Sequence, residues 1–248
     1  MCLAAFSLRT TADYALVFAA NRDELHERAS AAAGWWDDEP EIYGGRDLIA
    51  GGSWLAVDRR GRLAAVTNFR EDIRAEYSRS RGDLVRDYLA GSSSAIDYLA
   101  AIKDIQYEYG PFNLILYDGD ELHFASNRAL GRKLGEGIYA VSNTRFDTPW
   151  PKIGVARSSL AGCIRSADLE TCLFDFLTDD SYHGEEPPAD TPTRNRSTVF
   201  INDPRYGTRA STVVLLRQDG ELIFTERRFG PGGKYLGNSS QRFTTKRD

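Results

Sequence analysis

The 248-residue sequence is poor in the residues that bind metals, and this scarcity excludes several kinds of site. It has three cysteines, Cys2, Cys163 and Cys172, and three histidines, with no CxxC pair. A zinc site is therefore not expected, and neither a metal nor a cofactor is predicted. An odd number of widely spaced cysteines is not a disulfide framework. We expect Cys163 and Cys172, which stand among apolar neighbours, to be unpaired core residues.

The chain also lacks the segments typical of membrane and nucleic-acid-binding proteins. No apolar run approaches the roughly 18 residues of a membrane span, and no signal peptide precedes the first strand. The net charge is -5 with no basic stripe, which argues against a nucleic-acid partner. No GxGxxG or GxxxxGK[ST] phosphate loop is present. These absences favour a cytoplasmic protein, and its length and 42% hydrophobic content suit one domain over residues 1–248.

The apolar pattern predicts antiparallel hairpins at both ends of the chain and helices in its middle. Strands are expected at 2–8, 14–20, 53–58, 62–69, 112–118, 121–126, 137–143, 197–201, 210–217 and 221–227. Helices are expected at 81–90, 94–102, 152–165 and 167–178. Residues 25–43 and 179–196 are predicted to be irregular, and the tail from Gly230 to be loosely held. This order favours an α+β fold of two stacked, mainly antiparallel sheets with helices on their outer faces.

The beginning of the chain can place a nucleophile and a base on one residue. Removal of Met1 would leave Cys2 with a thiol and a free α-amine. The amine has an ordinary pKa of roughly 7.7–8.0, which suits a base near neutral pH. In a hairpin of 2–8 and 14–20, the segment 21–24 ends beside Cys2. We therefore expect Arg22 and Asp23 to reach the N-terminal residue.

Further polar residues stand near the ends of other predicted strands: Asn68, Asn143 and Arg209. An acyl-transfer site needs a nucleophile, a base and donors for the oxyanion. The two asparagines could supply these donors, Asp23 could hold the α-amine, and Arg22 could depress the thiol pKa.

Each of these residues also has a purely structural interpretation. Cys2 can be an inert residue of a buried first strand, and 21–24 can be a turn in which Asp23 bonds backbone amides. The two asparagines can be caps at strand ends, and Arg209 can be a surface residue.

The motifs of the chain, taken together, resemble the NRDE family of transport and Golgi organisation 2-like proteins. They are Met1-Cys2 with Phe6, Asn21-Arg22-Asp23-Glu24, Gly51-Gly52-Ser53-Trp54, Thr67-Asn68-Phe69-Arg70, Val141-Ser142-Asn143-Thr144 and Thr208-Arg209-Ala210-Ser211-Thr212. The resemblance covers most of the chain. It implies the fold of N-terminal-nucleophile hydrolases, a four-layer αββα sandwich.

A more distant likeness is to the choloylglycine hydrolase and penicillin V acylase group, which exposes its cysteine by processing. It implies catalytic roles for residues that match the motifs of that group: Cys2, Asp23, Asn68, Asn143 and Arg209. One departure concerns the early arginine, which in that group precedes the aspartate by three positions. Here position 20 is Ala20, and Arg22 adjoins Asp23. Adjacent strand residues point to opposite faces, so a role for Arg22 on the thiolate stays open.

Two functions follow as hypotheses from the residues and the resemblance. The first is an N-terminal cysteine hydrolase that cleaves a C–N amide or related acyl bond of a small molecule through a Cys2 acyl-enzyme. The alternative is a non-enzymatic ligand-binding or trafficking protein, with the haem- or lipid-related ligand that the family implies. An acyl-enzyme relic with a degenerate site is a third possibility.

Overall fold

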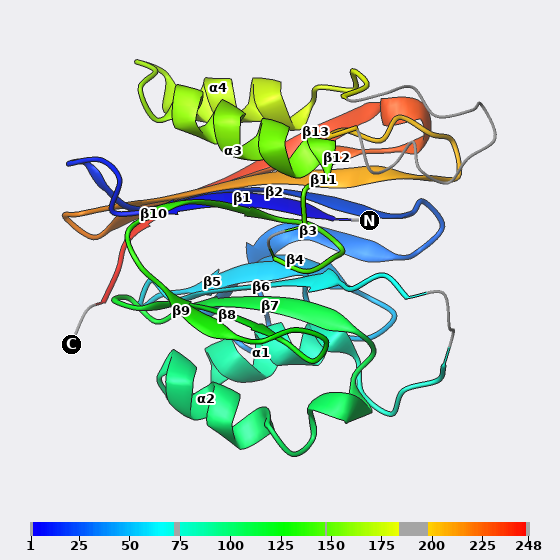
Figure 1. The fold of residues 1–248 in the computed structure, drawn as a ribbon, viewed down its shortest axis with the longest axis vertical. Coiled ribbons are helices and arrows are strands. Elements are labelled where there is room, and N and C mark those ends of the chain that lie inside the picture. The colour runs from blue at the N-terminus through cyan, green and yellow to red at the C-terminus, as the bar shows by residue number, and fades with distance from the viewer. Residues whose placement is uncertain (1, 72–74, 147, 184–197, 247–248) are drawn as a thin grey trace.

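In the computed structural model, which describes residues 2–71, 75–146, 148–183 and 198–246, two antiparallel sheets stack face to face (Figure 1). The pair α3 and α4 (Pro151–Cys163 and Leu169–Leu177) covers the outer face of the first sheet. The pair α1 and α2 (Arg81–Ala90 and Ala95–Ile102) covers the second. The order of layers is αββα, as the sequence predicts. Among the described residues, no helix is long and apolar enough to cross a membrane.

Every neighbouring pair of strands in both sheets is antiparallel. The first sheet has the order β10-β1-β2-β11-β12-β13, with bounds Gly137–Val141, Leu3–Leu8, Tyr14–Leu25, Tyr206–Arg217, Glu221–Phe229 and Tyr235–Thr244. The second sheet runs from β3 to β9 in chain order, with bounds Ser30–Trp35, Ile42–Asp47, Leu55–Asp58, Leu63–Asn68, Phe112–Tyr117, Leu122–Ser126 and Arg132–Leu134. Short 3-10 turns occupy Gln106–Glu108 and Pro231–Gly233.

Each sheet is buried on both faces, which explains why the strands lack a clear apolar alternation. Phe6 and Phe18 pack into the core between the sheets, with their rings stacked at 5.4 Å. Their neighbours Ala5 and Val17 face α3 and α4 instead. A third core lies between the second sheet and α1, where Leu84 and Tyr88 are buried. A fully buried Leu or Phe contributes about 1.5–3 kcal/mol, so the three cores supply the main stabilisation.

Several expected features are wrong. The tail beyond Gly230 is held by β13, which pairs with β12 along its length, and the segment 25–43 contains β3 and the start of β4. Of the strand expected at 197–201, the described part, 198–201, is a loop. Its Ile201 carbonyl accepts from the Thr208 amide at the start of β11. Of the loop expected at 179–196, positions from 184 onward lie outside the described residues.

Cys163 and Cys172 are joined in a disulfide, whereas the sequence predicts unpaired thiols. Their placement in the core is confirmed for Cys163, which is buried, and Cys172 packs against the same cluster. The bond forms because the end of α3 and the middle of α4 lie side by side, with the two Cα atoms 5.4 Å apart. Sequence spacing alone does not reveal this packing of two helices.

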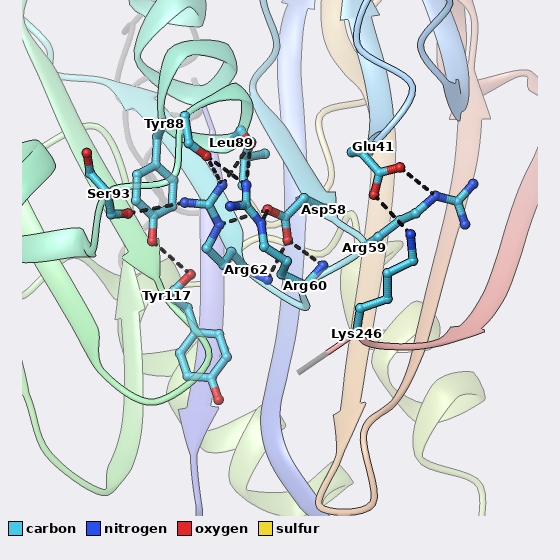
Figure 2. Close-up of polar contacts among 11 residues, drawn as sticks. Glu41, Asp58, Arg59, Arg60, Arg62, Tyr88, Leu89, Ser93, Tyr117 and Lys246 are labelled. Atoms are coloured by element: carbon cyan, nitrogen blue, oxygen red, sulfur yellow. Dashed lines mark hydrogen bonds and ion pairs between the residues drawn. The ribbon is translucent and has the colours of Figure 1, made fainter. Parts of the chain in front are cut away.

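A buried ionic cluster fastens the β5–β6 turn to the end of α1 (Figure 2). Asp58, fully buried, accepts from Arg62 Nε at 2.7 Å and from Arg60 Nε at 3.0 Å. The Arg62 guanidinium also donates to the Leu89 and Gly91 carbonyls, at 2.7 Å each. Leu89 is in the last turn of α1 and Gly91 directly follows the helix, where carbonyls have no helical partners. The cluster therefore caps α1 and fixes it on the second sheet.

Candidate active site

Cys2 directly precedes β1 and lines a polar cleft of about 690 Å³. It is a free cysteine and is partly exposed. Its backbone carbonyl accepts from Ser142 Oγ at 2.7 Å, which ties it to the end of β10. The cleft takes its walls from both sheets and from the start of α1: Cys2, Arg22, Asp23, Glu24, Leu25, Arg28, Asp47, Ser53, Trp54, Val66, Asn68, Tyr77, Arg79, Ser80, Arg81, Gly82 and Gly110.

The register of β1 and β2 brings the segment 21–24 to Cys2, as the hairpin predicts. Leu3 pairs with Asn21, so Cys2 stands beside Arg22 and Asp23 at the end of the sheet. Both residues line the cleft although their side chains leave opposite faces of β2. This is possible because Cys2 lies at the end of the sheet, where groups from either face can approach it.

Arg22 points into the space between the two sheets and is 5% exposed. Its guanidinium carbon lies 4.1 Å from the centre of the Trp54 ring, and its Nη2 lies 3.7 Å from Asp47 Oδ2. Burial lowers the pKa of Arg22, while the charges of Glu24, Cys2 and Asp47 oppose this shift. The cation is thus held in place by a ring and a carboxylate beside the thiol.

Asp23 points toward the helix layer and is 3% exposed. Its Oδ1 accepts from Thr208 Oγ1 at 2.8 Å, and its backbone carbonyl accepts from the Tyr206 hydroxyl at 3.0 Å. Burial raises the pKa of Asp23, and the Lys152 charge and the Thr208 hydrogen bond oppose the shift. A carboxylate fixed in this way can hold a cationic amine close to Cys2.

The two asparagines occupy different positions relative to the cleft. Asn68, at the end of β6, lines it. Asn143 is buried just beyond β10, and its Nδ2 donates to the Asn68 carbonyl at 2.6 Å. The Asn143 carbonyl accepts from the Arg70 amide at 2.8 Å. Asn143 therefore fixes the backbone that presents Asn68.

Arg209 is not among the residues that line the cleft. Its Nη1 donates to the Leu25 carbonyl at 3.1 Å and also to the Arg28 carbonyl. Leu25 is the last residue of β2, and Arg28 lies in the connection from β2 to β3. In this structure the Arg209 guanidinium therefore braces the connection that follows the 21–24 segment.

Sequence reasoning missed two basic residues near Cys2. Lys152, in the first turn of α3, is fully buried, and its positive charge acts on Asp23 and Cys2. Arg81, the first residue of α1, lines the cleft, donates to the Pro111 carbonyl at 3.2 Å and interacts with the Cys2 charge. The sequence feature that could have drawn attention to Lys152 is its position at the start of a predicted helix, directly after Trp150-Pro151.

The surroundings of Cys2 raise the pKa of its thiol above the ordinary value. Burial raises the pKa of Cys2, and the Asp23 carboxylate adds to this effect. The Asp23 backbone amide and the Arg22 guanidinium oppose it. A thiol in this state needs a base to become a nucleophile. Within the described ranges, no group of three or more His, Cys, Asp or Glu side chains is placed to hold a metal ion.

Comparison with known proteins relates the chain to one family. The family model described as Transport and Golgi organisation 2 matches residues 1–231. Transport and Golgi organization protein 2 homolog of Bos taurus is 31% identical over 256 residues, which cover 94% of this chain and 91% of that protein. The Homo sapiens homolog is 31% identical over 238 residues and covers 86% of each chain.

A solved structure is similar to this chain in fold. The C2A mutant of conjugated bile acid hydrolase from Clostridium perfringens aligns with a TM-score of 0.50 over 99% of this chain and 97% of that one, at 10% identity. Together with the two stacked sheets, this likeness shows the αββα fold of N-terminal-nucleophile hydrolases. The family match extends over nearly the whole sequence, and the chain therefore belongs to the transport and Golgi organisation 2 family.

Proposed function

We propose that the chain is an N-terminal cysteine hydrolase that cleaves an amide or related acyl bond of a small molecule. The observation that carries the proposal is that Cys2 lines a polar cleft together with Arg22, Asp23 and Asn68. The fold of N-terminal-nucleophile hydrolases supports it. The proposal requires removal of Met1, because the base is the α-amine of Cys2.

In the proposed reaction, the α-amine takes the thiol proton and the Cys2 sulfur attacks the acyl carbon. Asn68 donates to the oxyanion, and Asn143 supports Asn68 through its backbone. The C–N bond breaks as the amine passes its proton to the leaving nitrogen, which leaves a thioester on Cys2. Water, deprotonated by the same amine, then releases the acid and restores the thiol. Asp23 keeps the amine oriented throughout, and Arg22 stabilises the sulfur anion.

The experiment tests separately whether hydrolysis requires the Cys2 thiol and whether it requires a free α-amine. Cys2 is exposed by a site-specific protease from a chain that carries an N-terminal extension, and intact mass verifies the cleavage. A panel of acyl amides and thioesters is assayed before and after cleavage. We expect hydrolysis only after cleavage, and a loss of about a thousandfold or more in Cys2→Ser.

A matched control is the double variant Cys163→Ser/Cys172→Ser, which removes the other two cysteines and keeps Cys2. It should hydrolyse the same compounds as the unaltered chain. Equal hydrolysis by the extended and the cleaved chain, or by Cys2→Ser, would exclude the α-amine mechanism.

Ligand binding without chemistry is a second candidate, and a separate apolar cleft favours it. This cleft of about 590 Å³ lies along β10 and the start of α3, and Tyr139, Phe146 and Ile153 line it. Arg132 and Arg157 also contribute to its lining. An apolar wall beside two cations suits an amphipathic anion, such as haem or an anionic lipid.

A visible absorption titration with haemin and a fluorescence titration with an anionic lipid probe test the second candidate. A saturable change that Arg157→Glu weakens, at an exposed cation of this cleft, is expected if the cleft binds an anionic ligand. Arg157 is not among the residues that line the Cys2 cleft, so the two functions can fail independently.

A further inference from the structure

A small cavity of about 40 Å³ lies beside Arg22 and takes its lining from both sheets. It is separate from the open cleft at Cys2, and Arg22 and Trp54 form the wall between them. Its lining is Arg22, Ser30, Ala31, Trp54, Arg209, Ala210, Glu226, Arg228, Phe229 and Leu236.

Four buried polar atoms in this lining have no hydrogen-bond partner among the described residues. Three are donors, Arg22 Nη1, Trp54 Nε1 and Arg228 Nε, and one is an acceptor, Glu226 Oε2. A buried polar atom without a partner costs about 1–3 kcal/mol, so four at one place indicate a common partner. A cavity of this volume holds a water molecule, which both accepts and donates hydrogen bonds.

Glu226 is placed in this cavity by the pleat of β12. Leu222 and Phe224 on the same strand face the core between the sheets, and Glu226 continues that row. Its Oε1 accepts from the Ala33 amide at 2.9 Å. That amide is available because a register shift interrupts the β3–β4 ladder near Ala33. One carboxylate oxygen therefore joins the two sheets, and the other faces the cavity.

The groups around Glu226 are mostly cationic. Arg22 on β2, Arg209 on β11 and Arg228 on its own strand line the same cavity. Burial raises the pKa of the Tyr43 hydroxyl on β4, and the nearby Glu226 charge adds to this effect. Arg22 in turn faces Cys2, Glu24, Asp47 and Arg209.

We propose that Glu226 is a positioning residue for the thiol site: water in the cavity joins its carboxylate to Arg22, and its charge state sets how strongly Arg22 attracts the Cys2 thiolate. The proposal deepens the proposed function, because it concerns the reactivity of the nucleophile. Its test measures the reactivity of the Cys2 thiol without a substrate. The proposal can therefore be tested even if the hydrolase assay fails.

Glu226 changes charge in the neutral range. Burial raises the pKa of Glu226 to about 7, against the opposing effects of the Ala33 amide, Arg228 and Arg22. Below that pH the neutral acid leaves the Arg22 charge uncompensated, and Arg22 favours the thiolate. Above it, the carboxylate compensates Arg22, and the thiol pKa rises further. Reactivity of the thiol should therefore grow less steeply with pH around neutrality than that of a simple thiol.

The test follows alkylation of Cys2 by iodoacetamide from pH 5.5 to 9, with intact mass to verify one label per chain. Cys163 and Cys172 are joined in a disulfide, which leaves Cys2 as the free thiol. In the unaltered chain we expect the logarithm of the rate to flatten around pH 7 and then rise again. Glu226→Gln should follow a single thiol titration, equal to the unaltered chain near pH 6. Near pH 8.5 it should be roughly three- to tenfold faster, which is the ratio that a difference of about half to one unit in the thiol pKa produces.

Glu221→Gln is the matched control, since it removes a carboxylate from the same strand at an exposed ion pair with Arg242. It should reproduce the unaltered profile at every pH. If Glu226→Gln does not fold, infrared difference spectra of the unaltered chain serve instead, and a carboxylic acid band should disappear around pH 7. Parallel profiles for Glu226→Gln and the unaltered chain, or a buried carboxyl that titrates at its ordinary value, would overturn the proposal.

Discussion

At the scale of single residues, the candidate site combines groups that the sequence places by pairing with groups that only the tertiary fold supplies. Cys2, Arg22 and Asp23 meet because β1 and β2 form a tight hairpin, and hairpin register can be derived from an apolar run and a turn. Lys152 reaches Asp23 from a helix more than a hundred residues later. Helical periodicity assigns a lone lysine to a solvated face, so the sequence could not predict its complete burial.

The positive charge of Lys152 should reduce the free-energy cost of burying the Asp23 carboxylate in the folded chain. Lys152→Met removes a positive charge that acts on Asp23, and both groups are buried. We expect the free energy of unfolding in urea to fall by about 3–5 kcal/mol, the usual cost of leaving one buried charge uncompensated. The double variant Asp23→Asn/Lys152→Met should lose less than the sum of the single variants. Lys103→Met, at the exposed end of α2, is the control and should change little.

At the scale of elements, most interior strands were predicted, but the interior strand β4 and the edge strands β3, β9 and β13 were not. β13 and β3 are at the edges of their sheets and pack against each other. β13 is exposed or half-buried along its whole length, so it has no apolar pattern to detect. β3 contains a register shift that breaks its alternation. Edge strands often carry polar residues and bulges, which protect them from pairing with other chains and also hide them in the sequence.

The ionic cluster at Asp58 should stabilise the attachment of α1 far more than the neighbouring surface pairs do. Asp58→Asn leaves the buried Arg62 guanidinium without its carboxylate, and we expect a loss of about 3–5 kcal/mol in urea unfolding. Glu41→Gln is the matched control in the same region (Figure 2), where Glu41 pairs with Arg59 and Lys246, each at 3.6 Å, and is 57% exposed. Its loss should stay below about 1 kcal/mol. Similar losses in the two variants would contradict the burial of Asp58.

At the scale of the whole molecule, the two sheets are joined by an apolar core at one end and by polar side chains near Cys2. The Asn113 amide and the Thr67 hydroxyl of the second sheet donate to the Ser142 carbonyl of the first, at 2.9 and 3.3 Å. The αββα order itself could be predicted, since it follows from strands buried on both faces and from amphipathic helices. The polar contacts between the sheets depend on their relative placement, which no local sequence pattern specifies.

Glu226 lies in this region between the sheets, so its titration should appear in the stability of the entire chain. Its pKa is raised from an ordinary 4.5 to about 7 in the folded state, which means that the folded chain holds the proton more tightly than the unfolded chain. The stabilisation is therefore complete below pH 4.5 and is lost as the pH rises to about 7.

Urea unfolding of the unaltered chain and of Glu226→Gln at a series of pH values isolates this effect. Every other group titrates in both chains, so its contribution cancels in the difference between their free energies of unfolding. Relative to Glu226→Gln, the unaltered chain should lose stability on the order of 3 kcal/mol across that range. Carboxylates with lowered pKa, such as Asp47, act with the opposite sign at lower pH and cancel in the difference. Glu221→Gln should show no such divergence. A difference between the unaltered chain and Glu226→Gln that stays constant with pH would mean that Glu226 is already ionised at pH 5, which is incompatible with a carboxyl enclosed between two sheets.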